Sequence, residues 1–157
     1  KPHSPFQWEA QVSMEEYRRR VTLLRDHMRA KAISYNWHDA DTSLIEAVLS
    51  RGDSRVGAVI EEVWKNCGKL DSWTEYFSFS RWMAAFEKCG LDPKFYACRE
   101  RTFDETLPWS RVDIGVKPEF FWHEREMCYK AELSPDCRNK CTNCGALSLM
   151  NGGRCDG

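Results

Sequence analysis

The cysteines near the end of the chain are the residues best suited to chemistry. Cys137, Cys141 and Cys144 form a C-x3-C-x2-C pattern, and ten residues separate Cys144 from Cys155. Short spacings with Gly and Asn between the thiolates let the chain wrap around one ion. Four thiolates complete either a 4Fe–4S cluster or a tetrahedral zinc site. We therefore expect these four cysteines to be metal ligands for an iron–sulfur cluster or, alternatively, zinc, with Cys155 the weakest candidate.

The alternative to a metal site is that the terminal cysteines are simply reduced thiols in a flexible tail. The other four cysteines, Cys67, Cys89, Cys98 and Cys128, are scattered singly through helix-like sequence. The chain has no secretory signal and enough apolar residues for an ordinary core, which favours a reducing compartment over disulfides. The scattered cysteines are therefore expected to be small buried hydrophobic residues.

No other group of residues has a catalytic pattern. His123 and Glu124 lie on an aromatic helix without a third orienting group, and His27 and His38 are lone histidines beside a carboxylate. The nucleophile elbow, the phosphate-binding loop and the H-E-x-x-H zinc motif are all missing from the sequence. By motif alone we expect no catalytic residue and no enzyme activity in this chain.

Composition limits the class of protein. The 157 residues carry a formal net charge of −1 and are 42% hydrophobic, so one folded domain, or a domain with an appendage, is expected and nucleic acid is not indicated as a partner. No apolar run approaches the ~20 residues that span a membrane, so no membrane partner is expected. We expect a cytoplasmic protein, and the start at Lys1 without Met indicates part of a longer one.

Caps and apolar periodicity predict a mainly α fold of about five or six helices, with at most a few short strands and a Cys-rich C-terminal tail. Ser13 to Glu16 form a capping box for a first helix over 14–30, and alternation over 32–37 predicts a short strand. The further helices are expected to start at Asp41-Thr42-Ser43, Asp53, Ser72, Asp92-Pro93 and Lys117-Pro118. Ser43 and Glu46 are expected to cap the first of these five helices, and the last is expected to run to about residue 132. Three of the helices are expected to end at glycines, namely Gly52, Gly68 and Gly90.

The apolar faces of these helices are expected to form the core, with Trp37, Trp64, Trp82 and Phe86 among its large side chains. The resulting division is a lead-in over 1–12, a helical domain over 13–133 and a metal-binding tail over 134–157. Because no apolar face follows Leu133, the helical body is expected to fold without the terminal cysteines.

Several phrases, in order and over nearly the whole chain, resemble one family, the cobalamin-binding radical S-adenosylmethionine (radical SAM) proteins. The opening Lys1 to Trp8 is similar to the segment that closes the barrel in that family. The other similar phrases are Leu44 to Asp53, Gly90-Leu91-Asp92-Pro93, Leu107-Pro108-Trp109, Asp113-Ile114-Gly115-Val116 and Asp136-Cys137-Arg138 with Cys141 and Cys144.

This resemblance implies an accessory C-terminal domain downstream of a catalytic barrel in the same polypeptide. The longer protein would be a radical SAM enzyme that uses S-adenosylmethionine, a 4Fe–4S cluster and cobalamin, while this part alone would not be catalytic. The spacing of the first three terminal cysteines is also that of the family's catalytic cluster motif, but its position after the helices indicates a second, auxiliary metal centre. The substrate of the family stays unassigned.

The competing hypothesis is a stand-alone helical adaptor with a zinc knuckle that binds protein or nucleic acid. An adaptor has no need of a buried aromatic lead-in, so the packing of residues 1–8 discriminates between the two. A third, simpler hypothesis is a helical domain with no metal.

Overall fold

The computed structural model describes residues 1–28, 30 and 32–149, and it confirms the mainly α fold. This described part of the chain holds six α-helices and one 3₁₀-helix, and it has no β-strand. The chain divides into two compact units. Unit 1 combines Lys1–Glu9 with the chain from Arg101 onward, and unit 2 is Ala10–Glu100. The division predicted from the sequence, near residues 12 and 133, stays a prediction.

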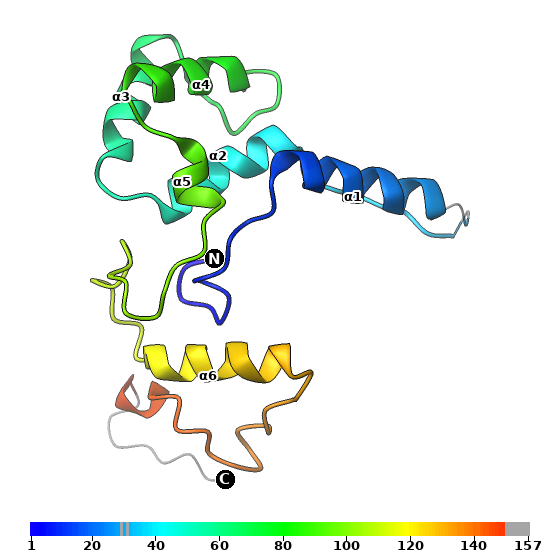
Figure 1. Cartoon of the computed structure of the whole chain (residues 1–157), viewed down its shortest axis with the longest axis vertical. Helices are drawn as coiled ribbons and strands as arrows, with labels where there is room; N and C mark the ends of the chain where they lie inside the picture. Colours follow the sequence, from blue (N-terminus) through cyan, green and yellow to red (C-terminus); the bar gives the residue numbers. More distant parts are fainter. Residues whose placement is uncertain (29, 31, 150–157) are drawn as a thin grey trace. The chain divides into compact units, whose positions relative to one another are not determined.

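Unit 2 carries five helices, which Figure 1 labels along the chain. They are α1 (Met14–His27), α2 (Ala40–Arg51), α3 (Val56–Lys65), α4 (Phe79–Lys88) and α5 (Pro93–Ala97). The core forms where α2, α3, α4 and α5 meet, and Val48, Val59 and Phe86 are at most 1% exposed there. Trp82 and Phe86 are buried as expected, because they lie one turn apart on the inner face of α4.

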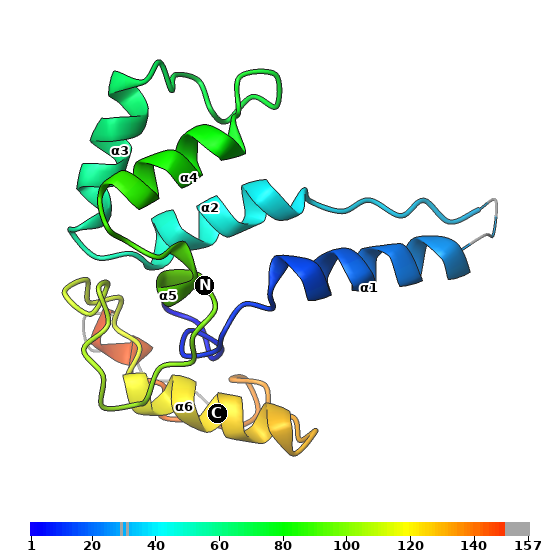
Figure 2. The same ribbon diagram turned by 45° about the horizontal axis from the view of Figure 1, so that its top comes forward.

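Helix α1 and the segment after it form an arm. None of the residues of α1 is buried. Figures 1 and 2 both show residues 32–39 returning beside α1 as an extended chain. The strand predicted over 32–37 is wrong, since one extended segment without a partner strand has no ladder to join. Instead the Tyr17 hydroxyl donates to the carbonyl of His38 at 2.9 Å, and the rings of Tyr35 and Trp37 stack.

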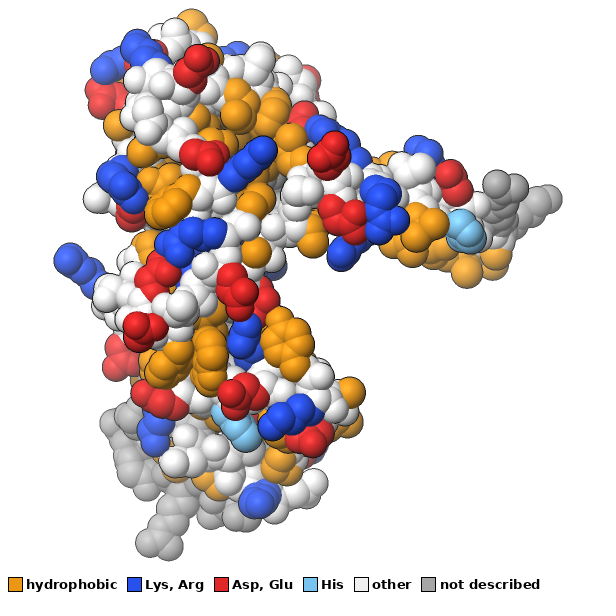
Figure 3. All heavy atoms as spheres, viewed as in Figure 1, with side chains coloured by type: hydrophobic (Ala, Val, Ile, Leu, Met, Phe, Trp, Pro, Cys, Tyr) orange, Lys and Arg blue, Asp and Glu red, His pale blue; other side chains and the backbone are white. Residues whose placement is uncertain are grey.

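Two of the four large side chains predicted for the core are exposed. Trp37 lies on the arm with 48% of its surface exposed, and Trp64 on α3 is 60% exposed. Val59 and Val63 turn one face of α3 to the core, so Trp64, one residue further on, faces away. Figure 3 shows hydrophobic side chains reaching the surface in the part of unit 2 that carries α2, α3 and α4.

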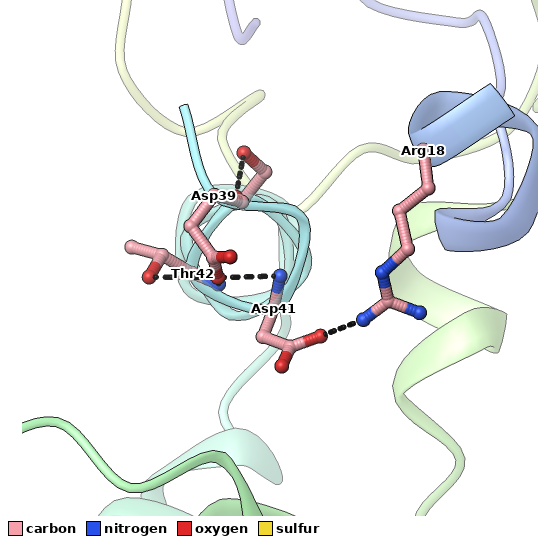
Figure 4. A network of polar contacts seen from close by, with 5 residues as sticks. Arg18, Asp39, Asp41 and Thr42 are labelled. Carbon is pink, nitrogen blue, oxygen red and sulfur yellow. Dashed lines mark hydrogen bonds and ion pairs between the residues drawn. The ribbon is translucent and has the colours of Figure 1, made fainter. Parts of the chain in front are cut away.

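The N-terminus of α2 is capped four residues earlier than predicted. Asp39 is the N-cap, and its carboxylate accepts the backbone N–H groups of Asp41 and Thr42 at 2.9 and 3.1 Å. Asp41 in turn pairs with Arg18 of α1 (Figure 4). Asp39 rather than Ser43 is the N-cap because a carboxylate at this position also interacts favourably with the helix dipole. The expected Ser43–Glu46 cap is therefore wrong, and the Ser43 hydroxyl donates to the carbonyl of Asp39.

The other helix ends follow the sequence signals in part, and the Asp53 cap predicted for α3 is wrong, because Arg55 is the N-cap of α3 and no side chain caps it. The Ser13 hydroxyl accepts the N–H of Glu16, but α1 ends at His27 rather than at residue 30. Gly90 follows α4 with a φ of 66°, which is the left-handed conformation expected of a helix-ending glycine. The helix predicted from Ser72 starts only at Phe79, with Ser78 as its N-cap, and the last helix ends at Tyr129 rather than near residue 132.

Unit 1 is built around the opening segment and α6 (Pro118–Tyr129). Trp8 is 1% exposed and packs against Phe103 and Trp122, with ring centroids 5.8 and 5.1 Å away. The backbone N–H of Arg101 donates to the carbonyl of Trp8 at 2.8 Å, and Arg125 of α6 pairs with Glu9. The aromatic lead-in is therefore a packed part of unit 1.

No helix in the described ranges is long and apolar enough to cross a membrane.

Candidate functional site

The cysteines predicted as metal ligands lie in the segment that follows α6 in unit 1. Cys137 and Cys141 are exposed, and Cys144 is half-buried. Cys155 lies outside the described residues. The segment from residue 132 to 144 contains turns but no helix, and the short 3₁₀-helix Ala146–Leu149 follows it.

The loop from Cys141 to Gly145 curls tightly around the first of its two thiols. The backbone N–H of Asn143 donates to the Sγ of Cys141 at 3.5 Å. Asn143 and Gly145 both have left-handed backbones, with φ of 56° and 101°. Hydrogen bonds to sulfur stabilise the thiolate form that metals bind and tune the centres that thiolates hold. We call Cys141–Gly145 the cysteine loop.

The cysteine loop is held against the start of α6. The backbone N–H of Lys117 donates to the carbonyl of Cys144 at 2.8 Å, and the Lys117 ammonium donates to the side chain of Asn143 at 3.1 Å. A Cβ at Gly145 would lie only 2.9 Å from the carbonyl oxygen of Gly115. Glycine at 145 therefore serves both the positive φ and this close approach.

The donor chemistry of the segment fits a thiophilic metal, but the thiols do not converge as they are placed. Between residues 1 and 149, apart from residues 29 and 31, no group of three or more Cys, His, Asp or Glu side chains is arranged to hold a metal ion. A centre that uses all three thiolates therefore requires this segment to rearrange. The metal site at Cys137, Cys141, Cys144 and Cys155 stays a prediction.

The burial predicted for the scattered cysteines is wrong for two of the four. Cys89 and Cys98 are half-buried and pack against the core of unit 2, and burial raises the pKa of the Cys98 thiol. Cys67 and Cys128 are exposed. Cys67 is exposed because it leaves the end of α3 in a left-handed turn, with a φ of 64°. Cys128 lies on α6, which buries none of its residues completely.

A cavity of about 310 Å³ lies in unit 1 and was not predicted from the sequence. Its aromatic walls come from Trp8, Phe103, Trp109 and Phe121, and its charged or titratable lining residues are His3, Glu105 and Asp113. We call it the aromatic cavity. Its lining residues come from two segments that lie about one hundred residues apart in the chain, so no local spacing could have revealed it.

A polar network fixes one wall of the aromatic cavity. The side-chain oxygen of Gln7 accepts the indole N–H of Trp109 at 2.7 Å and the backbone N–H of His3 at 3.1 Å. Gln7 is only 5% exposed, so both hydrogen bonds are shielded from water. The lining also includes Val116 and Pro118, which flank the Lys117 that binds the cysteine loop.

No protein-family model, curated protein or solved structure matches the chain. The similarity of the quoted phrases to the cobalamin-binding radical SAM proteins therefore stays a prediction. The chemistry of the cysteine loop and of the aromatic cavity follows from their own residues.

Proposed function

We propose that this chain is the accessory C-terminal region of a cobalamin-binding radical SAM protein and holds an auxiliary metal centre. The ligands are Cys137, Cys141, Cys144 and, as the fourth, Cys155. The observation that carries the metal proposal is the hydrogen bond from the N–H of Asn143 to the sulfur of Cys141. It gives the cysteine loop a backbone donor aimed at a sulfur, which is the kind of hydrogen bond that surrounds the sulfurs of thiolate-bound metal centres.

A thiolate set of this kind suits an iron–sulfur cluster, with zinc as the alternative. The exposed thiols of Cys137 and Cys141 leave the centre open to a partner, whereas the bond from Lys117 to Cys144 anchors it to α6. In this proposal the chain does not catalyse a reaction alone. Its partner is the radical SAM barrel of the same polypeptide, which would use S-adenosylmethionine, 4Fe–4S and cobalamin in the cytoplasm.

The packed lead-in supports this proposal over a stand-alone adaptor. Trp8 is almost completely buried, and Glu9 pairs with Arg125. A disordered lead-in would have favoured the adaptor, because an adaptor has no need to position an aromatic segment that precedes it.

Anaerobic purification of the whole chain, followed by metal and sulfide analysis and an absorption spectrum, tests the metal centre. Iron with sulfide supports an auxiliary cluster, and zinc alone supports a structural knuckle. The double variant Cys141→Ser and Cys144→Ser should lose the metal. The matched double variant Cys67→Ser and Cys128→Ser removes two other exposed thiols and should keep it. The proposal fails if chain kept reduced throughout binds neither metal, or if both double variants lose it equally.

The adaptor stays the second candidate because unit 2 has an exposed apolar groove. This groove, of about 430 Å³, lies beside α3 and includes Ile60 and Trp64, which are 47% and 60% exposed. Such a surface fits a protein partner better than a nucleic acid, which would require basic side chains. The reading frame upstream of Lys1 separates the two candidates, since a radical SAM barrel encoded there supports the accessory region and its absence supports the adaptor.

A further inference from the structure

We propose that the aromatic cavity of unit 1 binds a methylated ammonium group. This binding site is separate from the cysteine ligands and does not depend on the metal proposal. Two features of the lining carry the inference, namely its aromatic side chains and its charge.

The aromatic side chains make the cavity suitable for a cation of low hydration. Phe103, Trp109 and Phe121 are among its lining residues, and Trp8, which also lines it, is only 1% exposed. The negative face of such rings attracts a cation within ~6 Å, most strongly when the ring belongs to Trp. The guanidinium carbon of Arg101 already lies over Trp109, 5.7 Å from its centroid, so a ligand would depend mainly on the other rings.

The charge of the lining selects for a cation over an anion. Among the described residues that line the cavity, the carboxylates of Glu105 and Asp113 are the formally charged groups, and neither Lys nor Arg is present. Glu105 lies 3.7 Å from Arg101, so this pair is close to neutral. Asp113 accepts the backbone N–H of Gly115 at 2.7 Å, which fixes its carboxylate at the edge of the local turn. Arg101, beside the cavity, is paired with Glu105, so an anionic ligand would meet the carboxylate of Asp113 with no basic lining residue to offset it.

The size and polarity of the cavity favour a methylated ammonium over a primary one. A primary ammonium is strongly hydrated and needs three hydrogen-bond acceptors when it leaves water. Methyl groups remove those donors and match apolar walls such as Leu107, Val112 and Ile114. A volume of about 310 Å³ is at the small end of ligand sites, which suits a trimethylammonium head with a short stem.

Isothermal titration of the whole chain with choline, and with its neutral isostere 3,3-dimethylbutan-1-ol, tests the charge selection. The two molecules have the same shape and differ in one nitrogen and its charge. We expect choline to bind and the alcohol to bind at least tenfold more weakly. Equal binding of the two would show that the cavity does not select for positive charge, and it would overturn the proposal.

A peptide that contains trimethyllysine is the second arm, since the same head group occurs on proteins. Binding of choline identifies a free small molecule as sufficient, and binding of the peptide alone identifies a modified protein as the source. If neither choline nor the peptide binds to chain whose helical circular dichroism is intact, the proposal is wrong.

Substitutions locate the binding site. Asp113→Asn removes the charge but keeps an oxygen that can accept the N–H of Gly115, so the local turn should survive. It should weaken choline binding at least fivefold. The control is Asp104→Asn, which removes an exposed carboxylate that does not line the cavity and should leave binding unchanged. An equal loss in both variants, or no loss in either, would place the ligand elsewhere.

Discussion

At the scale of single residues, burial distinguishes cysteines whose sequence contexts are similar. Cys98 packs against the core of unit 2, and burial raises its pKa because the thiolate is poorly solvated there. Cys67 and Cys128 are exposed to water. Since the thiolate is the reactive form, the limited access to Cys98 and its raised pKa both slow its reaction with alkylating reagents.

We therefore predict that alkylation of the native, reduced chain at pH 8 modifies Cys67 and Cys128 well before Cys98. Mass spectrometry of peptides after timed exposure to iodoacetamide measures the three rates. In denatured chain the rates should become similar, because the burial of Cys98 is lost. A rate for Cys98 equal to that of Cys67 in the native chain would contradict its placement against the core.

At the scale of elements, the N-cap of α2 depends on one carboxylate. Asp39→Ala removes the acceptor for the N–H groups of Asp41 and Thr42, and we predict that it lowers the free energy of unfolding by about 1 kcal/mol. Ser43→Ala is the matched change at the position that the sequence favoured, and it should cost less than about 0.5 kcal/mol. Urea denaturation followed by circular dichroism compares the two variants. A larger loss for Ser43→Ala would restore Ser43 as the cap.

The turn between α2 and α3 carries a charge interaction that depends on pH. Arg55 donates to both carboxylate oxygens of Asp53, and this hydrogen bonding lowers the pKa of Asp53. A carboxyl group whose pKa is lowered on folding stabilises the fold above its unfolded pKa, near 3.9. That stability is lost as the pH falls through the lower, folded pKa.

Asp53→Asn should therefore destabilise the chain at pH 7 and lose this effect in acid. The difference at pH 7 should be no more than about 1 kcal/mol, because the pair is partly exposed and screened. Urea denaturation at a series of pH values between 7 and 2 gives the difference between variant and parent. A difference that grew as the pH fell would have the wrong sign for this mechanism.

Local signals predicted most of the helices but not which faces they bury. Caps such as Ser13 and stops such as Gly90 act within one turn, so their sequence pattern is sufficient. The exposure of Trp64 and the missing strand at 32–37 depend on what packs against each segment, which periodicity alone does not contain. The aromatic cavity could not be predicted for the same reason, since Trp8 and Trp109 are about one hundred residues apart in the chain.

At the scale of the whole molecule, unit 2 is one continuous stretch of chain, whereas unit 1 is assembled from two stretches. Every residue of the main core cluster lies between Leu44 and Ala97, inside the continuous unit 2. Unit 1 is discontinuous, because Trp8 comes from the start of the chain and its partners Phe103 and Trp122 come from after Arg101. The cysteine loop bonds to Lys117 of unit 1. The contacts within the folded chain thus separate at residue 100.

We predict that a fragment of residues 10–100 folds by itself and that a fragment of residues 101–157 does not. The first fragment contains the whole core cluster and none of the four terminal cysteines, so metal is irrelevant to it. The second lacks Trp8, whose burial contributes roughly 1.5–3 kcal/mol, and also lacks Glu9, the partner of Arg125. Helical circular dichroism and urea denaturation of each fragment measure the outcome. Adding a peptide of residues 1–9 to the second fragment should increase its helical signal. A non-cooperative transition in the first fragment, or a cooperative one in the second without the peptide, would show that the boundary at residue 100 does not divide the stability of the fold.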